Sequence, residues 1–135
     1  ISLMPTNLYG FGDNYDKYSS HVLPALIRKI WEGKEYSLPS VRCWGTGSPL
    51  REFLFVDDLS EAIIFCLEKW DPDLSDSPKT SKGEKLLLLN VGSNFEISIK
   101  DLAFKIAKFI ERSFSDGKET HKRLDRGEIM RHQNG

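Results

Sequence analysis

The sequence predicts an α/β fold, because short apolar runs alternate along the chain with longer segments of helical periodicity. The most apolar run, LLLLNVG at residues 86–92, is typical of a strand buried inside a parallel sheet. Residues 98–114 instead place apolar side chains at helical spacing. Ligands of such folds bind at the carboxyl ends of strands, so candidate functional residues are sought there.

The N-terminal part predicts a strand, a loop and a helix. The opening run ISLM is apolar, and Pro5 removes a backbone donor, so regular pairing is expected to end there. Glycines with neighbouring Asp and Asn predict a loop over residues 9–19. A helix follows, with Ser19 or Ser20 as its expected N-cap and Gly33 as its expected C-terminal residue.

The middle of the chain predicts two strands and a second helix. Residues 41–44 predict a short strand, GTGSP a turn and REFLFV a further strand. DDLSEAIIFCLEKW follows as a helix, with Asp57 and Asp58 at its positive end, where carboxylates are favourable. Its apolar stripe is expected to consist of Leu59, Ala62, Ile63, Cys66 and Leu67.

The C-terminal part predicts a loop, a strand, a helix and a tail. Residues 71–85 are rich in Asp, Ser, Pro and Lys and predict a mobile surface loop. The last helix should begin at a capping box of Ser98 and Asp101. Its stripe is expected to be Leu102, Ile106, Ala107 and Ile110. The domain is therefore expected to end at residue 114, and residues 115–135 to form a poorly ordered tail.

Composition excludes several classes of function. The 135 residues carry a formal net charge of −1, so no nucleic-acid partner and no membrane surface is expected. No apolar run approaches the ~18 residues that a membrane span needs. Cys43 and Cys66 lack CxxC spacing, which indicates buried free thiols in a reducing cytoplasm and neither a disulfide nor a metal site. Because the chain starts at Ile1, inside an apolar run, it is expected to be a fragment with an N-terminal half upstream.

Four segments occur in a fixed order: MPTNLYG, SSHVLPALIRK, WGTGSPLREFLFVDDL and LNVGSN. Together they closely resemble the C-terminal half of the GDP-L-fucose synthases, a family of epimerase-reductases among the extended short-chain dehydrogenases. REFLFVDDL alone is common to many nucleotide-sugar epimerases and dehydratases, whereas MPTNLYG followed by SHVLPALIRK is more specific. The resemblance covers residue 1 to about 110. It implies an α/β fold that is the incomplete, substrate-binding half of a Rossmann-type fold.

The resemblance also implies roles for individual residues. It places the nicotinamide end of NADP along Pro5, Thr6, Asn7 and Leu8, with Asn7 also facing the sugar nucleotide. His21 matches a family histidine that touches cofactor and substrate and acts as the acid in epimerisation. GDP-sugar contacts are implied for Lys29, Trp44 and Arg51, and, in a weakly similar segment of the tail, for Asp116.

The chemistry of these side chains suits the implied roles. Epimerisation beside a ketone passes through an enolate that must be reprotonated from the opposite face, and an imidazole titrates near neutral pH. Lys29 and Arg51 can neutralise a diphosphate, and Trp44 offers a flat face to a nucleotide. Considered singly, each residue also has a plainer interpretation. His21 could cap a helix, Lys29 could be a solvated cation, Trp44 could lie in the core, and Arg51 could pair with Asp57 or Asp58.

Some family features are absent from this sequence. Phe11 stands where the family usually has proline. Independently of the family, a GxGxxG pattern that begins at Gly10 has Tyr15 in place of its third glycine, so it does not predict a dinucleotide fingerprint. The NADP loop, the YxxxK pair and the catalytic cysteine of the family are expected upstream, so the isolated chain is expected to be inactive and the full-length enzyme to be a cytoplasmic homodimer. Another nucleotide-sugar epimerase or dehydratase, a non-catalytic remnant and a GDP-sugar-binding module remain alternatives.

Overall fold

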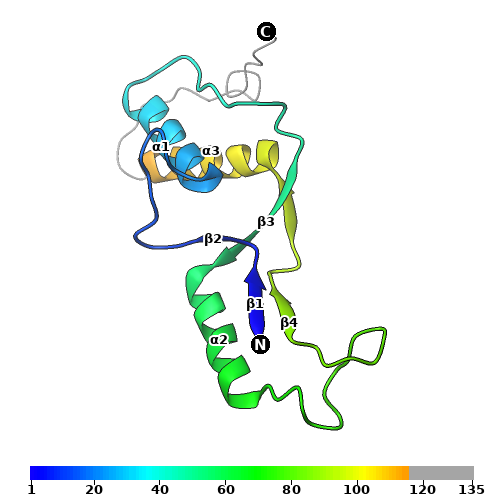
Figure 1. Cartoon of the computed structure of the whole chain (residues 1–135). Coiled ribbons are helices and arrows are strands. Elements are labelled where there is room, and N and C mark those ends of the chain that lie inside the picture. The colour runs from blue at the N-terminus through cyan, green and yellow to red at the C-terminus, as the bar shows by residue number, and fades with distance from the viewer. Residues whose placement is uncertain (116–135) are drawn as a thin grey trace. The chain divides into compact units, whose positions relative to one another are not determined.

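The computed structural model describes residues 1–115 and confirms the α/β class (Figure 1). The strands are β1 (Ser2–Pro5), β2 (Asn7–Tyr9), β3 (Leu50–Phe55), β4 (Leu88–Val91) and β5 (Glu96–Ser98). The helices are α1 (Val22–Glu35), α2 (Val56–Lys69) and α3 (Ile99–Ser115). The rest of the predicted tail lies outside the described residues, so the domain boundary at residue 114 stays a prediction.

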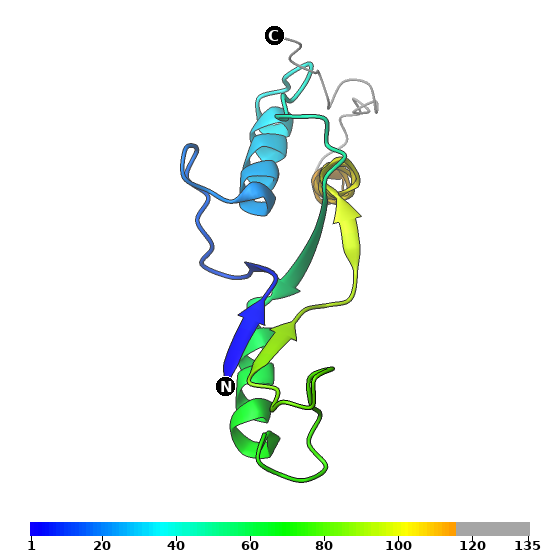
Figure 2. The ribbon, with the colours of Figure 1, turned by 45° about the vertical axis from the view of Figure 1, so that its right-hand side comes forward.

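The chain divides into two compact units. The first unit comprises Ile1–Phe11 and Glu52–Glu96, and the second comprises Gly12–Arg51 and Ile97–Gly135. In the first unit β1 and β4 pair in parallel, from Ser2 opposite Leu88 to Pro5 opposite Val91, and both views show them side by side (Figures 1 and 2). β2 pairs in parallel with β3, in a three-stranded sheet of order β2-β3-β5.

The parallel pairing of β1 with β4 fixes the carboxyl edge at which a ligand is expected. Pro5 and Val91 are the last pair of the ladder, and the N–H of Thr6 still donates to the carbonyl of Val91 at 3.1 Å. Thr6 and Gly92 are therefore the first residues beyond the two strands. Pairing between β1 and β4 ends at Pro5 as predicted, because the chain then moves on to pair with β3.

The strands of the structure differ from the predicted ones in three places. Tyr9 is the last residue of β2 rather than part of the loop, and its ring lies 5.5 Å from that of Phe55 on the paired strand. β5 was not predicted. Residues 41–44 form no strand, although buried Val41 and Cys43 alternate there with exposed side chains. The period of two is therefore real, but no neighbouring strand completes a ladder.

Both predicted ends of α1 were wrong. Its N-cap is His21. Ser19 does not cap the helix, because its hydroxyl donates instead to the carboxylate of Asp16 at 2.9 Å. Its last residue is Glu35, and Gly33 lies inside the helix and is buried. A Cβ at Gly33 would overlap a methyl group of Val41, so this glycine serves close packing and does not end the helix.

The core of the second unit lies between α1 and α3. Leu26 and Ile30 of α1 are buried, and on α3 the buried residues are Leu102, Ala103, Ala107 and Ile110. The predicted stripe is thus confirmed except that Ile106 is half-buried. One half of the capping box is confirmed, because the Ser98 hydroxyl accepts the N–H of Asp101 at 3.0 Å. The carboxylate of Asp101 accepts the hydroxyl of Ser98 at 2.7 Å rather than the backbone N–H of Ser98.

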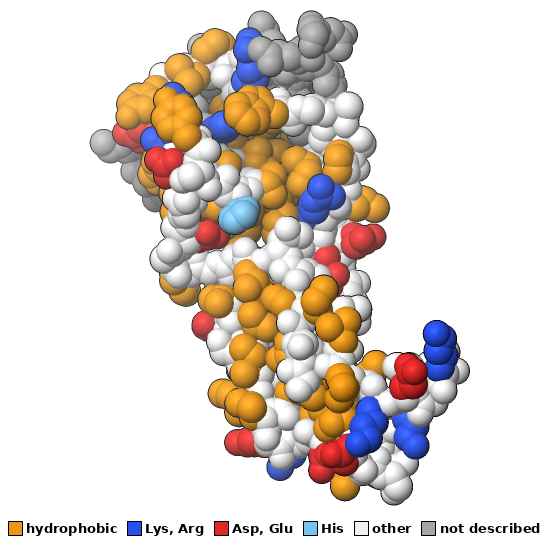
Figure 3. Space-filling model, in the orientation of Figure 1, with side chains coloured by type: hydrophobic (Ala, Val, Ile, Leu, Met, Phe, Trp, Pro, Cys, Tyr) orange, Lys and Arg blue, Asp and Glu red, His pale blue; other side chains and the backbone are white. Residues whose placement is uncertain are grey.

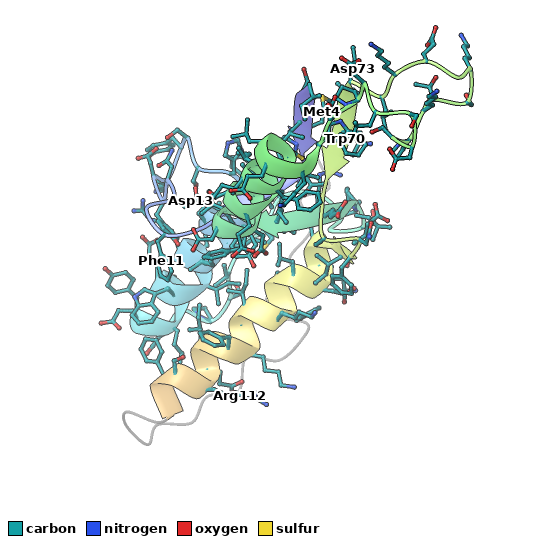
Figure 4. All side chains as sticks on the ribbon, turned by 90° about the horizontal axis from the view of Figure 1, so that it is seen from below. Met4, Phe11, Asp13, Trp70, Asp73 and Arg112 are labelled. Carbon is teal, nitrogen blue, oxygen red and sulfur yellow. The ribbon has the colours of Figure 1, made fainter. Side chains whose placement is uncertain are left out.

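The predicted stripe of α2 does not form a core. No residue of α2 is buried, and Leu67 is 82% exposed. Apolar side chains accordingly gather on the surface of the first unit (Figure 3). Asp57 and Asp58 do lie in the first turn, as predicted. The loop over residues 71–85 is confirmed as a loop, and its mobility stays a prediction. Asp73, labelled in Figure 4, forms an ion pair with Lys85.

Candidate functional site

Lys29 and Trp44 meet in the second unit. The ammonium nitrogen of Lys29 lies 4.8 Å from the centroid of the Trp44 ring, although the residues are fifteen positions apart. Buried Ile30 and Cys43, one beside each residue, anchor the two segments. Trp44 is 81% exposed, so it is not a core residue. A cation beside an exposed aromatic plane can receive a phosphate and a stacked base.

Cys43 directly precedes Trp44 in the sequence and is a poor candidate for a nucleophile. It is buried and free, and burial raises the pKa of its thiol, with the charge of Lys29 acting weakly in the opposite direction. A thiol that stays protonated is a poor nucleophile. Cys66 is also free but only half-buried, so the prediction of free thiols is confirmed for both cysteines and the prediction of burial for Cys43 alone.

Arg51 is exposed and does not form the predicted alternative ion pair. Its Nη1 donates to the carbonyl of Leu50 at 2.7 Å, and within residues 1–115 no ion pair joins it to Asp57 or Asp58. A guanidinium has five N–H donors, so others remain for a ligand. In the described part of the second unit, Arg51 makes no hydrogen bond or ring contact with the Lys29–Trp44 pair.

His21 occupies the N-cap position of α1, but its side chain does not cap the helix. Its backbone is extended (φ −70°, ψ 169°), its carbonyl accepts the N–H of Ala25 at 2.9 Å, and its ring makes no capping hydrogen bond. The residue is exposed. The interpretation of His21 as a side-chain cap was therefore wrong, and the imidazole is available for a ligand.

The loop before His21 is held by its own side chains. The carboxylate of Asp16 accepts the N–H groups of Tyr18 and Ser19, both at 3.0 Å, and these bonds lower its pKa. Arg28 of α1 donates to the carbonyl of Tyr15 at 2.9 Å and pairs with Glu32 at 2.6 Å. The segment that leads to His21 is thus tied to the helix that His21 begins.

The predicted nicotinamide segment, Pro5 to Leu8, lies in the first unit at the carboxyl end of β1. Pro5, Asn7 and Leu8 are exposed. The hydroxyl oxygen of Thr6 is buried and has no hydrogen-bond partner among the described residues. Asn7 donates through Nδ2 to the carbonyl of Glu52 at 2.9 Å. A buried hydroxyl without a partner is costly unless a ligand or water satisfies it, so Thr6 marks this segment as a candidate binding surface.

Glu52 is a residue of this region that sequence reasoning missed. Its carboxylate accepts the N–H of Asn94 at 2.7 Å, so it joins β3 to the turn that follows β4. The contact bridges 42 positions, and nothing in the local pattern of REFLFV distinguishes Glu52 from a solvent-facing residue of a strand. The predicted contact Asp116 lies outside the described residues.

Residues 1–115 lack two further classes of site. These residues contain no group of three or more His, Cys, Asp or Glu side chains arranged to hold a metal ion. None of the helices described is long and apolar enough to cross a membrane.

Comparison with known proteins gives the family. Residues 1–77, more than half of the chain, match the family described as "NAD dependent epimerase/dehydratase family". The chain belongs to this family. Its α/β fold with parallel strands is thereby the Rossmann-type fold of the epimerases and dehydratases, as predicted.

Relatives within the family agree with the predicted resemblance. The chain is 50% identical over 103 residues to "Probable GDP-L-fucose synthase 1" of Oryza sativa, a match that covers 76% of the chain and 27% of the relative. It is 47% identical over 103 residues to "GDP-L-fucose synthase 1" of Arabidopsis thaliana, covering 76% of the chain and 28% of the relative. The chain therefore spans little more than a quarter of the length of these relatives.

A solved epimerase-family structure has a similar fold. The GDP-mannoheptose C4 reductase MlghC of Campylobacter jejuni, determined with NADP bound, superposes with a TM-score of 0.65 at 25% identity. The match covers 92% of this chain and 49% of that protein.

Proposed function

We propose that the chain supplies the substrate-side part of an enzyme that converts GDP-4-keto-6-deoxy-D-mannose to GDP-L-fucose. The reaction comprises epimerisation at C3 and C5 and NADPH-dependent reduction at C4. The observation that carries the proposal is the 50% identity to a GDP-L-fucose synthase over 103 residues, which is 76% of the chain. Because the relatives are much longer, the remaining catalytic groups, including the Tyr-Lys pair, are expected upstream.

The GDP part of the substrate is assigned to the second unit. Trp44 is exposed beside the ammonium of Lys29, so the ring can stack on guanine while the cation neutralises a phosphate. Arg51, free of an acidic partner in the described part of the chain, can bind the diphosphate in a forked geometry. Asp116 is proposed as a further substrate contact on the basis of the family resemblance alone.

His21 is proposed as the acid of the epimerisation. A base of the complete enzyme takes the proton from the carbon beside the C4 ketone and later releases it to solvent. The enolate that remains receives a proton from a ring N–H of His21 on the opposite face of that carbon. The configuration is inverted, and the imidazole regains its proton from solvent. The availability of its ring, which caps nothing, supports this role.

The first unit is proposed to hold the nicotinamide end of NADP. The unpartnered buried hydroxyl of Thr6 fits a carboxamide, which can both donate and accept hydrogen bonds. When bound, NADPH supplies the hydride for reduction at C4. Pro5 and Leu8 would exclude water from this side of the nicotinamide, and Asn7 would face the sugar.

We also infer the setting of the enzyme. A cytoplasmic location is proposed because both cysteines are free thiols. A homodimer is proposed from the family resemblance, and light scattering of the complete gene product would test it. The isolated chain is proposed to be inactive.

The role of His21 can be tested in heavy water with the complete gene product that carries residues 1–135. The wild type should give GDP-L-fucose with deuterium at C3 and C5. His21→Gln should still reduce the ketone but lose epimerisation and deuterium incorporation, because the acid is missing. Ser20→Ala is the matched control and should behave as the wild type. Normal deuterium incorporation by His21→Gln would refute the role.

A binding module without chemistry is the second candidate, because the Lys29–Trp44 pair lies entirely in the second unit. In that case GDP should bind, binding should be lost in Arg51→Ala, and the complete gene product should turn over no substrate. Calorimetry together with an NADPH oxidation assay separates the two candidates. Another nucleotide-sugar epimerase or dehydratase would instead give a different product.

A further inference from the structure

We propose that Glu52 is a positioning residue that fixes the wall formed by Thr6 and Asn7. It does so by joining the turn after β4 to the start of β2. Three of the segments singled out in the sequence, MPTNLYG, REFLFVDDL and LNVGSN, meet at this one residue, whose carbonyl bonds Asn7 and whose carboxylate bonds Asn94. The inference concerns how the wall is held, and its kinetic consequence rests on the proposed function.

The carboxylate of Glu52 holds the turn after β4. Its Oε1 accepts the backbone N–H of Asn94 at 2.7 Å and the hydroxyl of Ser93 at 3.4 Å. Asn94 has a φ of 58°, in the left-handed region that residues other than glycine adopt at an energetic cost. A charge-assisted hydrogen bond to the N–H of this residue offsets that cost. The turn therefore depends on a side chain from another strand.

The turn and the wall approach each other at Gly92. A Cβ at this position would overlap Oε1 of Glu52 and lie 3.0 Å from the methyl group of Thr6. Glycine is thus needed because Glu52 fills the space beside it, and Thr6 packs against the same spot. The Glu52 carboxylate and the Thr6 methyl group therefore border the same space beside the turn.

The backbone of Glu52 sets the orientation of Asn7. Its carbonyl accepts Nδ2 of Asn7 at 2.9 Å, and the paired register of β2 and β3 continues from Asn7 opposite Phe53. This bond uses one of the two N–H donors of the amide, so the other N–H and the amide oxygen of Asn7 are left for a ligand. The wall therefore offers a donor and an acceptor at Asn7 and a hydroxyl at Thr6, which suits a ligand with a hydroxyl or an amide group.

The test uses the complete gene product with three variants. Glu52→Ala removes the carboxylate, and Gly92→Ala keeps it but pushes it from its place. Both should lower kcat by about 10- to 100-fold, because small displacements of a positioning group have effects of this size. Glu52→Gln keeps one acceptor oxygen, so its kcat should lie between those of the wild type and Glu52→Ala. Affinity for GDP should change less than about twofold, since Lys29, Trp44 and Arg51 are untouched. Glu61→Gln, an exposed carboxylate on α2, is the control.

A second readout does not depend on the reaction. The Asn94 amide should exchange with deuterium faster in Glu52→Ala and Gly92→Ala than in the wild type, and at the wild-type rate in Glu61→Gln. If the wild type makes no GDP-L-fucose, the proposed function fails, and this exchange experiment alone decides whether Glu52 holds the turn. The positioning role is overturned by unchanged exchange in Glu52→Ala. It is equally overturned if the variants lose stability and GDP affinity together with no change in kcat per folded enzyme.

Discussion

The ammonium of Lys29 lies 4.8 Å from the centroid of the Trp44 ring, so a cation on α1 faces an aromatic residue of a segment that has no regular structure. The ring stays 81% exposed, which leaves room for a ligand. An exposed tryptophan does not contribute to the core. The cation–π contact with Lys29 instead holds its ring in place. The pair is the part of the proposed GDP site that the structure supports best.

Truncation of the ring should weaken nucleotide binding. Stacking of a base on an aromatic side chain contributes about 1–3 kcal/mol, so Trp44→Ala should raise the Kd for GDP by roughly 5- to 150-fold. Trp44→Phe keeps an aromatic ring, so its Kd for GDP should rise less. Tyr36→Ala removes another exposed aromatic ring of the second unit and should leave the Kd unchanged. Calorimetry with GDP measures all three, and equal affinities for wild type and Trp44→Ala would argue against stacking.

Gly33→Ala should destabilise the protein, although alanine is usually favoured over glycine inside a helix by about 1 kcal/mol. The added methyl group would overlap buried Val41, and overpacking of this kind costs about 1–3 kcal/mol. Urea unfolding of the full chain provides the measurement. Val41→Ala combined with Gly33→Ala should cost less than the sum of the single changes, because the two sites share one space. Stabilisation by Gly33→Ala would contradict this account.

The same glycine shows where local sequence patterns are insufficient. Gly33 near the end of an apolar stripe predicts a helix end, and only the contact with Val41, eight residues later, reveals its use in packing. The capping box at Ser98 was predictable because both of its residues are local. β2 and β5 are three residues long and owe their existence to β3, so no periodicity could reveal them.

Ser98→Ala should destabilise α3. It removes the acceptor for the N–H of Asp101, and loss of an N-cap side chain costs about 1 kcal/mol. The same unfolding experiment gives the value, with Ser113→Ala near the other end of α3 as the control. A difference between the two variants below the experimental error would show that the box contributes nothing.

The loop before His21 should respond to acid. Its hydrogen bonds keep the pKa of Asp16 below the ordinary value, so they favour the ionised carboxylate in the folded state. The stabilisation is present above the unfolded pKa of about 3.9 and is lost as pH falls through the lower folded value. Asp16→Asn should therefore be less stable than the wild type at pH 7, and the difference should shrink as the pH falls below the unfolded pKa. Unfolding at a series of pH values tests this, and a difference independent of pH would contradict it.

The candidate site, like the fold, was predictable where the sequence itself carries the signal and not where distant segments pack together. Residues such as His21 and Arg51 were found because they stand in an ordered set of motifs, which carries family information. Their partners were not foreseen. The pairing of Lys29 with Trp44 and of Glu52 with Asn94 depends on how distant segments pack, and neither contact leaves a local pattern.

The identity of the product tests the central claim most directly. The complete gene product that carries residues 1–135 should be incubated with GDP-4-keto-6-deoxy-D-mannose and NADPH, and the nucleotide sugar formed should be identified by NMR. The account predicts GDP-L-fucose, formed with consumption of one equivalent of NADPH. A reduced sugar with unchanged configuration at C3 and C5, or an unreacted substrate, would contradict it.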